Sequence, residues 1–271
     1  MEEQKQSRLI VSEHDLANWQ TTNQDAWNRL ARSKHRLTTA ANDEQFIDPL
    51  KSIDALGWIG SSVHGKHVLC LAAGGGRHGP LFAAAGAATT VVDLSPAMLQ
   101  LDRTVATERG LTLRTIQTSM EDLSMLDRDE FDLVVQPVSS CYVPDIRPVY
   151  REVARVLRAG GRYISQHKQP VNLQSSLNTE RGAYRIMHEY YRTQPIPAEP
   201  DFPSSPFREP GATEYLHRWE ELLGELCRSG FVIEDVMEPY HANTSSSPGS
   251  SFHRSLFVPP YVRIKARRLG E

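Results

Sequence analysis

The chain has 271 residues, and its 33 acidic and 30 basic side chains leave a formal charge of −3 with neutral histidine. A content of 39% hydrophobic and 23% charged residues is typical of a globular protein of one or two domains and excludes disordered, collagen-like and coiled-coil chains. The charge is close to zero and no long basic run occurs, which argues against nucleic acid or an anionic membrane as partner. We therefore expect a small-molecule partner.

The cysteine spacing and the apolar segments indicate in which compartment the protein works. Cys70, Cys141 and Cys227 lie far apart without a CxxC pair, so the sequence predicts neither a disulfide framework nor a metal site. The N-terminus lacks the apolar stretch of a signal peptide, and the least polar segment, 81–94, is too short to span a membrane. We expect a cytoplasmic protein with no membrane anchor, working as a monomer or homodimer.

The N-terminal region is predicted to be helical. Trp19, Trp27 and Leu30 recur at roughly helical spacing after Ser12, which is a plausible N-cap. This pattern indicates one or two amphipathic helices over residues 12–36. A second helical stretch is expected from about 43 to 58.

From residue 68 onward, strands and helices alternate. Strands are expected at 68–71, 89–93, 112–116, 131–135 and 162–167, with helices ending near 85 and spanning 96–109 and 145–157. Ser95 and Pro96 form a typical helix start. Continuous apolar runs in such an alternation predict a parallel sheet covered on both faces. The predicted fold class is α/β.

The alternation stops after His167. Residues 168–212 hold seven of the 17 prolines, which indicates an inserted cap or a long loop. Within it, an aromatic helix is predicted around residues 184–191. A helix over 213–229, ended by Gly230, and strands at 231–237 and 261–266 complete the predicted elements.

A glycine-rich turn after the first strand points to a nucleoside site. The string VLCLAAGGGRHG, residues 68–79, places glycines where backbone N–H groups can approach a ligand, and Asp93 at the end of the second strand can accept ribose hydroxyls. Its letters also satisfy the dinucleotide pattern GxGxxG. However, Asp93 follows the last glycine by only 14 residues, and the chain lacks a second mononucleotide half. The pattern therefore favours a different nucleoside cofactor from NAD.

Five segments in order resemble the class I S-adenosylmethionine-dependent methyltransferases, and the likeness covers about residues 66–267. They are VLCLAAGGG, VVDLSPAML, SMEDL, FDLVVQPVSSCYVPD and REVARVLRAGGRYI. The resemblance implies a Rossmann-like, seven-stranded, mostly parallel sheet with helices on both faces. It also implies an N-terminal helical lid (1–60), a cofactor-binding core (61–167), a cap insertion (168–212) and a C-terminal part that completes the sheet (213–271).

The same resemblance implies S-adenosylmethionine as cofactor. Asp93 would hold the ribose, Leu94 and Met98 would flank the adenine, and the SMEDL segment would contact it. The family's usual first-strand acid is Cys70 here and its first glycine is Ala72, so we expect backbone groups to hold the methionine end. The predicted cofactor-binding residues are Ala72, Gly74, Gly76, Asp93, Leu94, Met98, Ser119, Met120, Glu121 and Gln136.

The implied reaction is methyl transfer to a small organic acceptor, releasing S-adenosylhomocysteine. Tyr142 and His167 follow strands at the edge where an open α/β sheet binds ligands, so they are the candidate catalytic residues, with His167 as a possible general base. The loop 136–138 is not of the type that methylates nucleic-acid bases. The accepting atom stays open among O, N, S and C. Two alternatives are a nicotinamide-dependent oxidoreductase and a non-catalytic nucleoside-binding domain.

Overall fold

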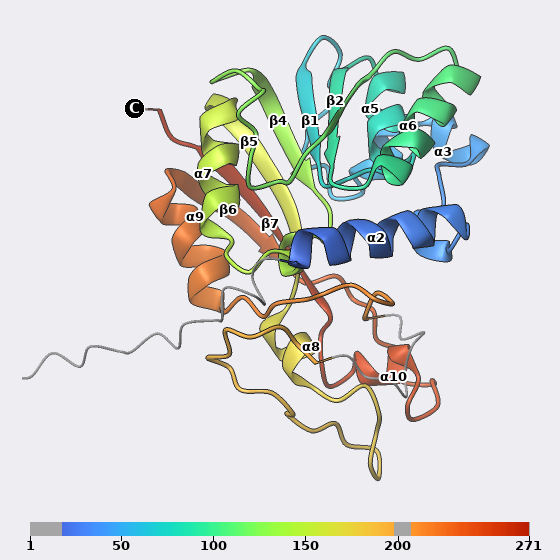
Figure 1. Cartoon of the computed structure of the whole chain (residues 1–271), viewed down its shortest axis with the longest axis vertical. Helices are drawn as coiled ribbons and strands as arrows, with labels where there is room; N and C mark the ends of the chain where they lie inside the picture. Colours follow the sequence, from blue (N-terminus) through green and yellow to red (C-terminus); the bar gives the residue numbers. More distant parts are fainter. Residues whose placement is uncertain (1–17, 198–206, 271) are drawn as a thin grey trace, which may run out of the picture.

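A seven-stranded sheet with strand order β3-β2-β1-β4-β5-β7-β6 forms the centre of the molecule (Figure 1). It is seen in a computed structural model that describes residues 18–197 and 207–270. The first five strands are parallel, and β7 runs antiparallel to both β5 and β6. The strands are β1 His67–Leu71, β2 Ala88–Asp93, β3 Arg114–Gln117, β4 Phe131–Gln136, β5 Leu157–Lys168, β6 Phe231–Met237 and β7 Tyr261–Arg268. The predicted α/β fold class is confirmed.

Both faces of the sheet are covered, as the apolar runs predict. In β1, Leu69 and Leu71 join the hydrophobic cluster that includes Tyr150 and Val153 of α7 (Arg147–Val156). The alternate residues Val68 and Cys70 pack with Phe82 of α5 (His78–Ala84), because successive side chains of a strand point to opposite faces. The other helices are α2 Trp19–Arg32, α3 Asp43–Ile47, α4 Pro49–Ile53, α6 Pro96–Glu108, α8 Pro170–Gln174, α9 Glu225–Arg228 and α10 Ser251–Arg254. Two short 3₁₀ helices, η1 Arg36–Thr38 and η2 Ser140–Tyr142, and one π-helical turn, η3 Glu220–Gly224, complete the helical elements of the described residues.

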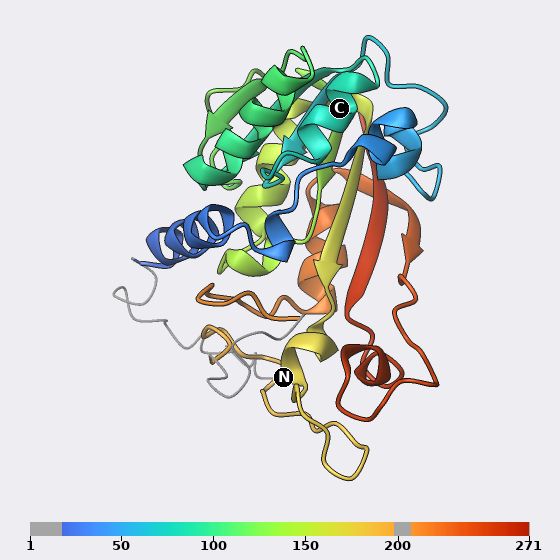
Figure 2. The same cartoon turned by 90° about the vertical axis from the view of Figure 1, so that its right-hand side faces the viewer.

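Helix α2 and the segments after β5 lie at the carboxyl end of the parallel strands (Figures 1 and 2). Asn23 of α2 is buried, and its amide nitrogen donates to the carbonyl oxygens of Tyr142 (3.0 Å) and Thr213 (3.2 Å). Three distant parts of the sequence thus meet at one edge of the sheet. The predicted division into four parts, and the closing of a lid, remain predictions. No helix among the described residues is long and apolar enough to cross a membrane.

Several predicted elements need correction. The stretch expected to be helical over 43–58 is divided at Pro49 into α3 and α4, because proline cannot donate the backbone N–H that a helix interior requires. The strand expected over 162–167 runs from Leu157 to Lys168 as β5, and the last strand extends to Arg268.

The two helices predicted after residue 180 also differ from the structure. Residues 184–191 form turns and an isolated bridge between Ser175 and Ile186 rather than a helix. Their aromatic residues pack elsewhere, with Tyr184 beside His253 and Phe257. The helix expected over 213–229 begins only at Glu220. The Tyr215 N–H donates to the Cys141 carbonyl at 2.7 Å instead of to a helical partner, and residues 212–218 have no regular structure.

Candidate functional site

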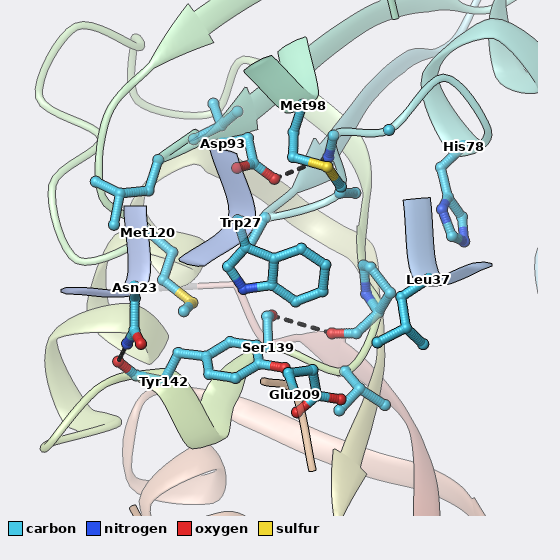
Figure 3. A pocket seen from close by; sticks show the side chains of 18 of the residues that line it. Asn23, Trp27, Leu37, His78, Asp93, Met98, Met120, Ser139, Tyr142 and Glu209 are labelled. Carbon is cyan, nitrogen blue, oxygen red and sulfur yellow. Dashed lines mark hydrogen bonds between the residues drawn. The ribbon is translucent and has the colours of Figure 1, made fainter. Parts of the chain in front are cut away.

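A cavity of about 520 Å³ opens at the carboxyl end of β1, β2 and β4 (Figure 3). Its walls come from α2, the glycine turn, the ends of the strands and the segments that follow β5. The lining residues are Trp19, Asn23, Trp27, Leu37, Thr39, Ala72, Ala73, Gly74, Gly75, Arg77, His78, Val92, Asp93, Leu94, Met98, Thr118, Ser119, Met120, Pro137, Val138, Ser139, Tyr142, Gln166, Glu209 and Tyr261. Most of the predicted cofactor residues are among them.

Asp93 and the glycine turn form one wall. The Gly74 N–H donates to Oδ2 of Asp93 at 2.9 Å, and the Ser95 N–H donates to Oδ1 at 2.8 Å. A Cβ on Gly74 would meet Met98 Cβ at 2.8 Å, so only glycine fits this position. Burial raises the pKa of Asp93 to about 6, although hydrogen bonds from backbone N–H groups oppose the rise. Each carboxylate oxygen keeps a lone pair for a ligand hydroxyl, which suits the ribose of a nucleoside cofactor.

Gly76 supports the turn from behind and does not line the cavity. It has φ +77, and a Cβ there would meet Ala40 Cβ and the Leu101 carbonyl oxygen at 3.1 Å. The neighbouring Gly75 N–H donates to Oδ2 of the buried Asp102 at 2.8 Å. Gly76 therefore shapes the turn, and its predicted contact with the cofactor remains a prediction.

The predicted adenine-side residues divide into two groups. Leu94, Met98, Ser119 and Met120 line the cavity, whereas Glu121 does not and instead accepts from the Ser119 hydroxyl at 3.4 Å. Gln136 is also outside the lining. It is buried, its Nε2 donates to Ser139 Oγ at 2.8 Å, and its Oε1 accepts from the Tyr163 hydroxyl. Gln136 therefore holds Ser139, which does line the cavity.

Trp27 and Tyr142 enclose the cavity on the side of α2. Their rings meet edge to face, with centroids 5.7 Å apart and planes at 78°. Trp19 also lines the cavity, but it is buried in the large hydrophobic cluster. Trp19 thus belongs to the hydrophobic core as well as to the cavity wall, while Trp27 faces the space available to a ligand (Figure 3).

The Tyr142 ring points toward the Glu209 side chain (Figure 3), and both residues line the cavity. The buried ammonium of Lys168 lies 2.5 Å from both Glu209 Oε2 and Glu214 Oε1, and Arg208 pairs with the other Glu214 oxygen. Burial, and then the charge of Glu209, raise the pKa of the Tyr142 hydroxyl, so it stays protonated. Burial also raises the pKa of Glu209, but Lys168 and hydrogen bonds more than offset this and lower it to about 2.

His167 is placed away from the cavity. Its side chain is fully buried, with Nδ1 2.7 Å from Ser140 Oγ and Nε2 2.8 Å from Ser165 Oγ. Burial, and to a lesser extent His217, lower its pKa to about 3. The expectation that His167 stands beside the acceptor is corrected, because the alternation of β5 directs this ring into the interior.

Some lining residues could not be found from motifs. Glu209, Gln166, Tyr261, Leu37 and Thr39 come from segments outside the family-like strings. Glutamate at 209 has no spacing relation to Lys168 or Tyr142 in the sequence. A useful signal would have been the basic residue at the end of a buried strand, Lys168, since a buried charge needs a partner. Among residues 18–197 and 207–270, no cluster of three or more His, Cys, Asp or Glu could hold a metal ion.

Comparison with known proteins gives relatives along most of the chain. Residues 69–165 match a methyltransferase domain family. The chain is 30% identical over 228 residues to the uncharacterised methyltransferase YbaJ of Bacillus subtilis, covering 80% of this chain and 89% of that protein. It is 32% identical over 144 residues to the ubiquinone biosynthesis O-methyltransferase of Aeromonas salmonicida, covering 52% and 55% of the two chains. The fold is similar to an S-adenosylmethionine-dependent methyltransferase structure from Mesorhizobium loti, with TM-score 0.63, 23% identity and coverage of 79% and 96%.

Proposed function

The chain belongs to the class I S-adenosylmethionine-dependent methyltransferases, and from this premise we propose how its cavity divides between cofactor and acceptor. The cofactor lies along the glycine turn and Asp93, and a small organic acceptor enters beside Tyr142. The observation that carries this division is the lining itself, which runs from Gly74 and Asp93 to Tyr142 and Glu209.

The residues at the turn fit the cofactor. Asp93 accepts the ribose hydroxyls, and the side chains of Leu94, Met98 and Met120 provide an apolar surface for the adenine. Ser119 lies beside them, while the backbone of Ala72 and Gly74 faces the methionine part. Gly76, Glu121 and Gln136 hold these contacts in place from behind. The bound cofactor supplies an activated methyl group on a positively charged sulfur.

The protein's own contribution is position and exclusion of water. Holding the acceptor atom in line with the methyl group converts a collision into an ordered step, which is worth several kcal/mol of the barrier. Trp27 and Tyr142 close the cavity on one side and keep water from the reacting atoms. No general base is assigned, since His167 is buried and is not among the lining residues.

A small acceptor is favoured over nucleic acid. The formal charge of −3 supplies no electrostatic attraction for phosphates, and the cavity volume of about 520 Å³ lies in the usual range for small-molecule sites. The relative from Aeromonas salmonicida is named as an O-methyltransferase of ubiquinone biosynthesis. This name supports a small acceptor here as well.

We also propose that the protein works in the cytoplasm as a monomer or homodimer. The three cysteines are free, with Cys70 and Cys141 buried. Free thiols are typical of a reducing compartment. Fractionation of cells followed by size-exclusion chromatography with light scattering tests both statements.

Two measurements test the proposed function. Calorimetry with S-adenosylhomocysteine and, separately, with NAD should show binding of the first and not of the second. Transfer of a labelled methyl group to a panel of small hydroxyl, amine and thiol compounds, compared with duplex DNA and tRNA, should label a small compound. Binding of NAD alone, or labelling of nucleic acid alone, would contradict the proposal.

A further inference from the structure

The acceptor end of the cavity has a polar group that no sequence motif indicates. Glu209 lines the cavity next to Tyr142, and its side chain is only 7% exposed. Its partner Lys168 is fully buried at the end of β5. A buried ion pair is costly to form unless further hydrogen bonds complete it, and here one member also faces the ligand space. Packing of the segment around Glu209 does not by itself require a carboxylate that faces the cavity, so we look for a role in ligand binding.

We propose that Glu209 and the Tyr142 hydroxyl form the subsite that orients the methyl acceptor, and that this acceptor is a small uncharged compound with a hydroxyl on a planar ring. This inference rests on the proposed function and names its substrate class.

The hydrogen-bonding capacity of Glu209 and Tyr142 favours a methyl acceptor that carries a hydrogen-bond donor. Tyr142 stays protonated, and its ring points toward the Glu209 carboxylate (Figure 3), which can accept the phenolic proton and leave the oxygen lone pairs of Tyr142 available. The Glu209 carboxylate accepts only. Both groups can therefore accept a hydrogen bond at this end of the cavity, and the O–H of a methyl acceptor donates to one of them while leaving its own oxygen lone pairs for the methyl group.

Charge favours an uncharged compound over an ammonium. Lys168 and Arg208 supply two positive charges against the two carboxylates of Glu209 and Glu214, so the four groups sum to zero when all are ionised. Burial, and then the charge of Glu209, raise the pKa of Glu214 to about 7, although Lys168 opposes the rise, and a proton on Glu214 would make the sum positive. In neither state does the cluster attract a further cation.

The surrounding surface favours a planar ring. Trp27, Tyr142 and Tyr261 contribute aromatic walls, and Val138 and Leu37 add apolar surface. Aromatic side chains prefer edge-to-face or offset contacts with another ring. A compound with one hydroxyl and a flat apolar body matches one polar corner among apolar walls.

The group transfer keeps its atoms in balance. The acceptor oxygen forms a bond to the methyl carbon, and the sulfur–carbon bond breaks with its electron pair left on sulfur. The hydroxyl proton stays in its hydrogen bond to Glu209 until the product is released and the proton passes to bulk water. Since the pKa of Glu209 is about 2, this carboxylate orients the O–H and does not retain its proton. Glu209 is therefore an acceptor-binding residue and not a general base.

The experiment compares phenol with anisole, which has the same ring but no O–H. Binding of each is measured by ligand-observed NMR on protein saturated with S-adenosylhomocysteine. Phenol should bind at least about threefold more tightly, because anisole has no O–H to donate to the carboxylate and hydrogen bonds to an ionised group are the stronger kind. Glu209→Gln should remove most of this preference, and Tyr142→Phe should reduce it independently.

Glu214→Gln is the matched control. Glu214 shares Lys168 with Glu209 but does not line the cavity. It should keep the phenol preference even if its melting temperature falls as much as that of Glu209→Gln. If Glu209→Gln does not fold, Tyr142→Phe decides the question.

Three outcomes would overturn the inference. They are an unchanged phenol preference in both Glu209→Gln and Tyr142→Phe, an equal loss in Glu214→Gln, or tighter binding of benzylammonium than of phenol. Failure of the wild-type protein to bind S-adenosylhomocysteine would instead contradict the proposed function, so the two failures are separate.

Discussion

Asp93 and Gly74 are joined by a hydrogen bond of 2.9 Å from the glycine N–H to Oδ2 of the aspartate. This bond ties the turn after β1 to the end of β2, so the same carboxylate shapes the turn and faces the cavity. Ser95 binds its other oxygen at 2.8 Å. The geometry of the turn and the capacity to hold a ribose therefore depend on one side chain.

The first prediction follows from this double role. Asp93→Ala should weaken the binding of S-adenosylhomocysteine by at least about tenfold, because hydrogen bonds to a charged group contribute about 1.5–3 kcal/mol. Isothermal titration calorimetry measures the affinity, and circular dichroism checks that the variant is folded.

Asp132→Ala is the control for this variant. Like Asp93, Asp132 lies in a parallel strand and accepts a backbone N–H, here that of His67 at 2.8 Å. It also pairs with Arg158, but it is outside the cavity lining. Its removal should leave the affinity unchanged. An Asp93→Ala protein that is folded and binds as tightly as wild type would contradict the ribose assignment.

The second prediction concerns Trp27. Since its ring lines the cavity beside Tyr142, binding of S-adenosylhomocysteine should change tryptophan fluorescence. Trp27→Phe should remove most of that change. Trp58→Phe should preserve it, because Trp58 is buried outside the lining and its carbonyl is near Arg162. A full change retained in Trp27→Phe would show that the tryptophan does not meet the ligand.

The hypothesis that α2 belongs to a lid can be tested separately. If residues 1–36 act as a lid, deleting them should lower the activity more than the thermal stability. However, Asn23 and Asn28 of α2 are buried and bonded to Tyr142, Thr213 and Ser95. These bonds lead us to expect a clear drop in melting temperature. A truncated protein with unchanged melting temperature and low activity would favour the lid.

The strands and the cofactor turn could be predicted because their signals are local. The continuous apolar run of β1, the glycines after it and the Ser95-Pro96 cap each act within a few residues, and the structure has Ser95 Oγ accepting the Met98 N–H at 3.1 Å. Asp93 could be placed beside the glycine turn because parallel strands bring their carboxyl ends together, and it lines the cavity. These parts of the fold need no information from distant segments.

The acceptor end could not be predicted for the opposite reason. Glu209 and Glu214 reach Lys168 across 41 and 46 residues, and this pairing, together with the bond from the Tyr215 N–H to the Cys141 carbonyl, leaves residues 213–218 without the helix that their spacing predicts. Tertiary contacts outweigh intrinsic helix preference, which is a weak determinant. His167 shows the same limit, since the end of a strand was predicted correctly but the direction of its side chain was not.

The third prediction concerns Asp102 behind the glycine turn. Its carboxyl group is buried, and among the described residues Oδ1 has no hydrogen-bond partner. Burial raises its pKa to about 7 from 3.8, despite backbone bonds from Gly75 and Gly76. Between these two values the folded state holds a proton that the unfolded state has lost. The stabilising contribution of Asp102 is therefore lost as pH rises from about 4 to 7.

Asp102→Asn tests this sign. Asparagine does not ionise, so the free energy of unfolding of the variant should rise relative to wild type between pH 5 and pH 8. Urea denaturation at these two pH values measures the difference. A difference that stays constant, or falls, would show that Asp102 ionises in the folded state as it does in the unfolded chain.

The fourth prediction separates structure from catalysis at His167. His167→Ala leaves the hydroxyls of Ser140 and Ser165 without the ring and opens a cavity, so the protein should lose about 2–4 kcal/mol of stability. Because the pKa of His167 is lowered to about 3, the unfolded chain binds more protons below about pH 6.5. The ring's contribution is thus full above pH 6.5, and the loss should be largest at pH 7 and smaller at pH 5.

Kinetics complete this test of His167. A ring that stays neutral and buried takes no part in proton transfer, so kcat/KM per folded molecule should keep its wild-type dependence on pH from 6 to 9. A general base would behave differently, since its removal lowers the rate most at low pH and least at high pH, where the acceptor ionises unaided. A rate deficit in His167→Ala that disappears toward pH 9 would restore the base hypothesis. It would also require the ring to reach the cavity by a movement of the Ser139–Tyr142 loop, because Ser140 holds Nδ1 in this structure.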